Sequence, residues 1–199
     1  MMKIKNFEKE LPKGYKEVYK IDAKNKKTIG FINILSLLLF LVVIVPLLLY
    51  YRYKTGLPLI LMLNAGTSRY LVLIAVYIAY IFGHEFVHGA AYWLLTRQKL
   101  TFGIALFVAF CGVPDIYVYQ KPALIAVLAP LVVFGIIFSV AIIVSTTIMW
   151  KIIWVLALSV HIGGCIGDIW VACMMIFKFR DPKLLVRDTG PKQTFYNLN

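Results

Sequence analysis

The chain has 199 residues, of which 61% are hydrophobic and 15% charged, and its mean hydropathy is +0.83. Soluble domains are about half apolar and about a quarter charged, so this composition excludes an ordinary soluble domain and indicates one integral-membrane domain. The formal net charge is +12, but the basic residues gather at the ends of apolar runs. That placement suits anionic lipid headgroups, so we expect the lipid bilayer, and no nucleic acid, as a partner.

The chain opens with a polar segment, residues 1–28, that carries nine lysines and predicts a basic cytosolic tail. This segment has no short apolar core, so we do not expect a cleavable signal peptide. The three cysteines, Cys111, Cys165 and Cys173, are odd in number and lie in apolar surroundings. We therefore expect small buried thiols rather than a disulfide framework.

Four apolar runs follow the polar segment, each long enough to cross a hydrocarbon core of about 30 Å. They cover residues 29–51, 70–96, 122–150 and 152–177. The pattern predicts an all-α integral membrane fold with four transmembrane helices. Residues 29–178 would form a single membrane domain, and residues 179–199 a cytosolic C-terminal tail.

The connection between the second and third runs is apolar but too short to cross a membrane as a helix. "LTFGIALFVAF" and "IYVYQ" are rich in aromatic and β-branched residues and flank a Cys-Gly-Val-Pro-Asp break, which indicates a β-hairpin. Unpaired strand edges cannot face lipid. We therefore expect a small hairpin that is re-entrant or lies at the membrane interface.

The basic residues predict the topology. With both termini in the cytosol, 17 Lys and Arg lie inside and four lie outside. The positive-inside rule favours this arrangement. We therefore expect a multi-pass protein of the cell membrane with both termini cytosolic.

The second run contains "IFGHEFVHGAAYW", residues 81–93, in which an HExxH motif lies inside an apolar helix. Residues four apart share a helix face, so His84 and His88 can offer two imidazoles to one zinc ion. Glu85 points about 100° away, where it can act as a general base instead of a ligand. Ionisable groups within a span are costly to insert, so this cluster predicts a functional site. The alternative is a metal-free cluster of interhelical hydrogen bonds.

A catalytic zinc usually has three protein ligands, and the fourth run offers Asp168 and His161 as the third. A zinc between His84 and His88 would lie about 16 Å from the cytosolic end of its helix, Asp168 about 15 Å and His161 about 25 Å. Depth therefore favours Asp168. His161 shares a helix face with Cys165 and Asp168, so His161 and Cys165 are candidates to support the ligands from behind. A core histidine bonded to a carbonyl is the competing interpretation of His161.

These motifs resemble known metalloproteases. An HExxH motif in a transmembrane helix, a following apolar hairpin and an Asp beside a Gly on a later helix resemble the site-2-protease class of intramembrane zinc metalloproteases. "LPKGYKEV", "GHEFVHG", "LAPL" and "GCIGDIW" together resemble more closely a bacterial family of membrane zincin peptidases of unknown function. The resemblance implies a bacterial protein with Zn²⁺ as cofactor. It also implies that Asp168, here in the order Gly167-Asp168, is the third ligand.

The sequence thus predicts a zinc-dependent intramembrane or membrane-proximal peptidase of the HExxH type. Its metal ligands would be His84, His88 and Asp168, its general base Glu85, and its substrate a membrane protein or peptide. The first alternative is a non-catalytic assembly or scaffold factor with a structural zinc, in which His161 or Cys165 closes the site. The second is a metal or proton transporter, which would need acidic residues across the whole bilayer. The sequence does not predict an oligomeric state.

Overall fold

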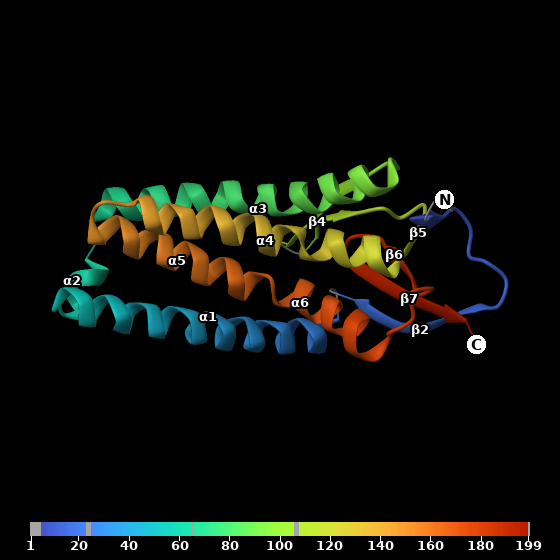
Figure 1. Cartoon of the computed structure of the whole chain (residues 1–199), viewed down its shortest axis with the longest axis horizontal. Coiled ribbons are helices and arrows are strands. Elements are labelled where there is room, and N and C mark those ends of the chain that lie inside the picture. Colours follow the sequence, from blue (N-terminus) through green and yellow to red (C-terminus); the bar gives the residue numbers. More distant parts are fainter. Residues whose placement is uncertain (1–4, 23–24, 65, 106–107, 199) are drawn as a thin grey trace. The chain divides into compact units, whose positions relative to one another are not determined.

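The computed structural model describes residues 5–22, 25–64, 66–105 and 108–198 (Figure 1). These residues are mostly helical, with a five-stranded and a two-stranded sheet. The chain divides into two compact units. The sheet unit comprises Met1–Phe31, Gly83–Ala129 and Gly167–Asn199, and the helical unit comprises Ile32–Phe82 and Pro130–Ile166.

Within the described ranges, three helices are long and apolar enough to cross a membrane. They are α1 (Lys26–Thr55), α3 (Thr67–Thr96) and α4 (Gln120–Val144). A short helix, α2 (Leu59–Leu63), lies between α1 and α3. These helices coincide with the first three predicted runs, but α4 ends earlier than predicted. The turn falls at residues 145–147 because Thr147 caps α5 (Ile148–Gly164), its hydroxyl accepting from the Trp150 N–H.

The fourth predicted run is not one continuous helix. Helix α5 ends at Gly164, α6 covers Ile166–Cys173, and a π-helical segment, η1, covers Met174–Lys178. The two halves are bent by 42° and together would make a fourth span. Three glycines flank the break, and glycine has a low helix propensity. The break places Asp168 in the first turn of α6.

The predicted helical fold is confirmed in part, but the five-stranded sheet, built largely from the two chain ends, was not predicted. Its strand order is β1-β5-β6-β7-β2, and every pair is antiparallel. The strands are β1 (Phe7–Glu8), β2 (Tyr15–Asp22), β5 (Tyr117–Tyr119), β6 (Leu185–Asp188) and β7 (Lys192–Leu198). Strands β2 and β7 pair from Tyr15 opposite Leu198 to Asp22 opposite Lys192, with one irregularity (Figure 1). Segments predicted as tails therefore form four of the five strands.

The predicted hairpin is present, but its second strand differs from the prediction. Strand β3 (Thr101–Ala105) pairs with β4 (Val108–Gly112), so the first apolar stretch supplies β3 and most of β4, which ends in the predicted break. "IYVYQ" instead supplies β5, which pairs with β1 and β6. The chain leaves the hairpin along β6, since the Val113 N–H donates to the carbonyl of Asp188 at 2.9 Å. Gly112 allows this close approach, because a Cβ there would lie 2.5 Å from the Gly190 nitrogen.

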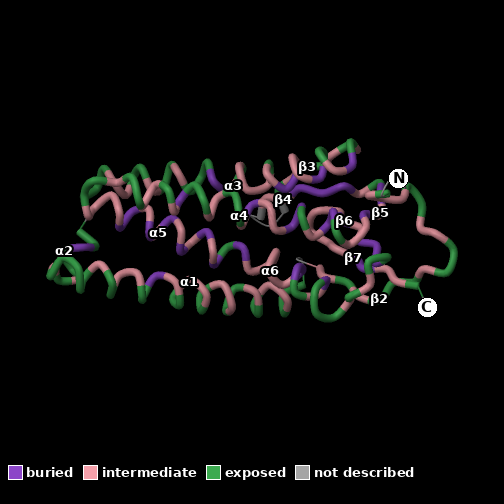
Figure 2. Tube along the Cα trace, viewed as in Figure 1, coloured by how far each residue is buried: buried purple, intermediate pink, exposed green. Residues whose placement is uncertain are grey.

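A single apolar core joins the sheet to the helix ends within the sheet unit (Figure 2). Its fully buried members include Val118 and Phe195 of the sheet, Ala126 of α4 and Met175 of η1. Tyr92 brings α3 into the same core. Packing of this kind holds the ends of α3, α4 and α6 at defined positions, which is the requirement for a site built from all three.

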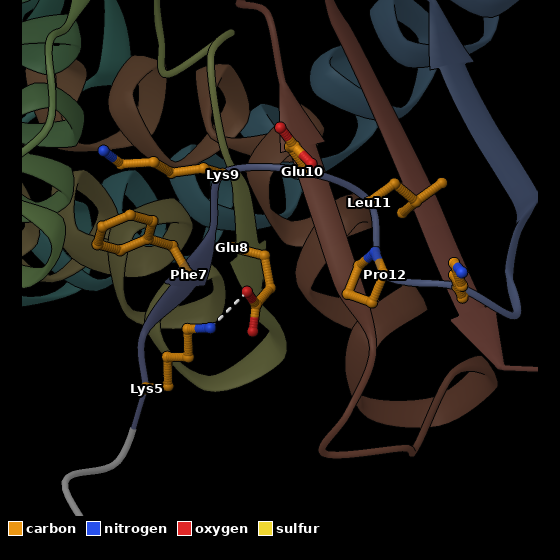
Figure 3. A pocket seen from close by; sticks show the side chains of 8 residues that line it. Lys5, Phe7, Glu8, Lys9, Glu10, Leu11 and Pro12 are labelled. Atoms are coloured by element: carbon orange, nitrogen blue, oxygen red, sulfur yellow. Dashed lines mark hydrogen bonds and ion pairs between the residues drawn. The ribbon is translucent and has the colours of Figure 1, made fainter.

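The N-terminal segment also holds the end of α3. Residues from Lys5 to Lys13 line a surface pocket, in which Lys5 and Glu8 form an ion pair (Figure 3). The side-chain amide of Asn6 donates to the carbonyl of Leu95 at 2.7 Å. That carbonyl belongs to the last turn of α3, where backbone acceptors lack helical partners. Asn6, the residue before β1, therefore caps the helix that carries the HExxH motif.

Candidate metal centre

Helix α3 brings the two motif histidines onto one face. The Nε2 atoms of His84 and His88 lie 3.2 Å apart, and their ring centroids are 4.8 Å apart. This proximity follows from the spacing of four residues along an α-helix. Both side chains belong to the sheet unit.

Asp168 joins the two histidines from the first turn of α6. Its Oδ2 lies 3.2 Å from Nε2 of His84, and its Oδ1 lies 3.4 Å from Nε2 of His88. The three side chains are only 11% to 17% exposed. Two residues from one helix and one residue 80 positions later thus present a compact group of three donor atoms.

The orientation of His88 is determined by the backbone of α4. Its Nδ1 lies 2.9 Å from the carbonyl oxygen of Ala126. A carbonyl can only accept a hydrogen bond, so Nδ1 carries a proton, and in the neutral ring Nε2 carries the lone pair. That lone pair faces His84 and Asp168, which is the arrangement of a histidine that binds a metal through Nε2.

The three donor atoms fit a zinc ion. A tetrahedral zinc with ligands at about 2.0–2.1 Å places those ligands about 3.3 Å from one another. The two Nε2 atoms are 3.2 Å apart, and each lies 3.2–3.4 Å from one or the other oxygen of the Asp168 carboxylate, which is close to this value. Within the described residues, Oδ2 of Asp168 is buried and accepts no hydrogen bond, so a cation between these atoms would satisfy it. Two imidazoles and one carboxylate also form a donor set found in catalytic zinc sites.

Glu85 lies beside this group and faces a different neighbour. The backbone of Cys111, in β4, offers a hydrogen bond to the Glu85 carboxylate. Gly89 makes this approach possible, because a Cβ there would lie 2.7 Å from the Phe102 ring and 3.0 Å from the Cys111 sulfur. The β3–β4 hairpin therefore packs directly on α3, next to the carboxylate that the sequence marks as a general base.

His161 and Cys165 lie in the helical unit. Nδ1 of His161 lies 2.9 Å from the Tyr80 hydroxyl, and Nε2 lies 3.2 Å from the carbonyl oxygen of Leu131. The Cys165 sulfur lies 3.6 Å from the same Nδ1. His161 is fully buried, and both ring nitrogens have neutral partners. These contacts are those of a core histidine bonded to a carbonyl.

Sequence reasoning missed a buried polar group in the sheet unit. The Asp188 carboxylate accepts hydrogen bonds from the Tyr92 hydroxyl at 2.9 Å, the Gly190 N–H at 2.8 Å and the Gln193 amide at 3.2 Å. Burial raises the pKa of Asp188 to about 6. Tyr92 lies one helical turn beyond His88, so this contact links the C-terminal strands to the motif helix. A lone Asp in a polar segment carried no local signal of this role.

Comparison with known proteins identifies one family. Residues 76–181 match a family described as "Putative zincin peptidase". This region contains His84, Glu85, His88 and Asp168, together with the β3–β4 hairpin. No curated protein and no solved structure matches the chain.

Proposed function

This chain belongs to the family described as "Putative zincin peptidase", and from its cluster of two imidazoles and one carboxylate we propose that it is a zinc-dependent peptidase. The observation that carries the proposal is the convergence of His84, His88 and Asp168, with donor atoms 3.2–3.4 Å apart. We further propose that it acts within or close to the membrane, because the motif helix is one of three helices long and apolar enough to cross it.

We assign the metal ligands to His84, His88 and Asp168. Zinc bound by them would supply Lewis-acid chemistry, since it polarises a peptide carbonyl and acidifies water. His88 presents Nε2 because the Ala126 carbonyl holds its Nδ1 proton. His161 is left out of the ligand set, because its ring nitrogens contact Tyr80 and Leu131.

Glu85 is the proposed general base. It is adjacent to His84 in sequence but lies off the face shared by the two histidines. Its carboxylate accepts the proton of the attacking water and delivers it to the amine that leaves the cleaved bond. The Cys111 backbone lies beside this carboxylate on the hairpin side.

The hairpin suggests how a peptide substrate is held. Among the described strands, β4 pairs with β3 alone, and its Cys111 lies next to Glu85. An extended segment of a membrane protein or peptide that adds to the hairpin edge would pass close to the proposed base. Strand addition also requires the substrate to unwind, which exposes its peptide bonds to attack.

The proposed setting is the cell membrane of a bacterium. The excess of basic residues in the predicted inside segments, 17 against four, supports cytosolic termini. α5 and the segment Ile166–Lys178 would then act together as the fourth span. The proposed ligands lie toward the cytosolic ends of α3 and of this bent span, so we expect water to enter from that side.

The test is hydrolysis by purified full-length protein in lipid nanodiscs, with quenched fluorescent peptides that carry apolar segments. The proposal expects about one zinc per chain and cleavage that a chelator abolishes and zinc restores. Zinc bound without cleavage by the wild-type protein would instead support a structural zinc in an assembly or scaffold factor. A protein that retains full zinc occupancy after His84→Ala and His88→Ala together would refute the ligand assignment.

A further inference from the structure

Pro130 lies inside helix α4, four residues after Ala126. In an α-helix the N–H of each residue donates to the carbonyl four residues earlier. Proline has no N–H, so this donor to the Ala126 carbonyl is missing. The helix nevertheless continues on both sides, from Gln120 to Val144.

The Ala126 carbonyl, which Pro130 leaves without its helical donor, is buried. Ala126 is 0% exposed and belongs to the apolar core of the sheet unit. A buried carbonyl without a donor is costly, so such groups are nearly always paired. Nδ1 of His88 provides the pairing at 2.9 Å.

We propose that Pro130 is a positioning residue for the metal centre. By removing the helical donor, it reserves the Ala126 carbonyl for His88, holds the proton on Nδ1 and turns Nε2 toward His84 and Asp168. The inference rests on the proposed role of His88 as a zinc ligand. It explains the orientation of the His88 ring by a residue in another helix, Pro130, which lies 42 positions after His88 in the chain.

Helix α1 offers a matched control, because Pro46 lies inside it as Pro130 lies inside α4. The carbonyl that Pro46 frees belongs to Val42, which is 67% exposed. Both prolines interrupt a long apolar helix, but only Pro130 frees a carbonyl that contacts a proposed ligand. Pro46→Ala therefore reports the effect of restoring a helical N–H without a change at His88.

The experiment compares wild type, Pro130→Ala and Pro46→Ala, each full-length and in nanodiscs. Pro130→Ala returns an N–H that competes with His88 for the Ala126 carbonyl. Zinc affinity, measured by competition with a chelator, should fall about tenfold, the lower end of the usual effect of losing such a supporting contact. The thermal midpoint of the metal-free protein should stay or rise, because the helix gains a hydrogen bond. Pro46→Ala should leave zinc affinity within about twofold of wild type.

A second readout does not need zinc. Nitrogen-15 NMR of histidine-labelled, metal-free protein should show wild-type His88 protonated on Nδ1, and Pro130→Ala should show both tautomers. Wild-type His88 with no proton on Nδ1 would overturn the inference, whether or not any variant folds. Equal zinc affinity and an unchanged tautomer in Pro130→Ala would also overturn it, and would leave the proposed function standing. Failure of wild type to bind zinc would instead count against the proposed function, while the tautomer still tests the role of Pro130.

Discussion

The two units each bury a histidine against a carbonyl of helix α4, yet only one of these histidines faces a carboxylate. In the sheet unit, His88 bonds to Ala126 through Nδ1, and its Nε2 faces His84 and Asp168. In the helical unit, His161 bonds to Leu131 through Nε2, and its Nδ1 faces the Tyr80 hydroxyl. The carbonyl bond thus selects the tautomer in both cases. The group opposite the second nitrogen decides whether a lone pair is left for a metal.

The surroundings of the two histidines also differ in charge: His161 lies among aromatic rings, whereas His88 lies in the unit that holds the acidic residues. His161 is enclosed by the rings of Tyr80, Phe134 and Phe138, at centroid distances of 5.4–6.0 Å. All nine acidic residues of the chain lie within the sheet unit, and none lies in residues 32–82 or 130–166. A cation therefore has no protein carboxylate to bind within the helical unit. A buried histidine in this chain is therefore a candidate ligand only where the fold also supplies negative charge.

The largest expected effect is on hydrolysis in Glu85→Gln. Glutamine keeps the size and hydrogen bonding of the side chain but cannot accept the proton, so the rate should fall by about 10² to 10⁴. Zinc content should remain at the wild-type level, because Glu85 is not an assigned ligand. Cleavage assays and metal analysis on the same preparation measure both. Glu10→Gln, at an exposed position, is the control. A wild-type rate in Glu85→Gln would remove Glu85 from the chemistry.

The next effect is on metal retention in Asp168→Ala. This change removes the carboxylate that distinguishes the site in the sheet unit from the surroundings of His161. Zinc affinity should fall by more than about 100-fold, which exceeds the usual loss when a residue that only supports a ligand is removed. Chelator competition measures the change. Asp115→Ala, at an exposed turn, should bind zinc as wild type does. Equal affinities for the two variants would show that Asp168 is not a ligand.

The free energy of unfolding should depend on pH through Asp188, which belongs to the sheet unit. Burial raises the pKa of Asp188 to about 6 from the model-peptide value of 3.8. The folded state therefore binds this proton more tightly, and the contribution of Asp188 to the free energy of unfolding increases as pH falls from above 6 toward 4. The increase amounts to at most about 3 kcal/mol. Denaturation of Asp188→Asn beside wild type, from pH 4 to pH 7, should show this slope only in wild type. Parallel curves would contradict the assignment.

The smallest effect is expected in the helical unit. His161→Phe removes the contacts of the ring with the Tyr80 hydroxyl and the Leu131 carbonyl, at a cost of about 1–3 kcal/mol in unfolding free energy. Zinc affinity should stay at the wild-type value, because His161 is not an assigned ligand. Tyr80→Phe, which deletes only the hydroxyl, is the milder companion variant. A loss of zinc in His161→Phe would place this histidine in the metal site and favour the structural-zinc alternative.

The sequence by itself determined features that depend on local periodicity. Long apolar runs predicted α1, α3 and α4, and the spacing of four residues placed His84 and His88 on one helix face. Helical rise also brought Asp168 to the depth of these histidines, although the helix that carries it is broken at Cys165. Each of these features follows from neighbours within about two turns, which is the range over which helix geometry acts.

Features that depend on partners far apart in the chain became visible only in the folded structure. The pairing of β2 with β7 joins residues 15–22 to 192–198, and neither segment has an apolar pattern that reveals the other. The segment that forms β5 was predicted to be part of the hairpin, but it pairs with β1 and β6, which come from distant parts of the chain. The contact of His88 with Ala126 likewise joins two helices, and the sequence shows only a proline in α4. Strand pairing and the satisfaction of buried polar groups depend on which surfaces meet, and that is a property of the packed chain rather than of any short segment.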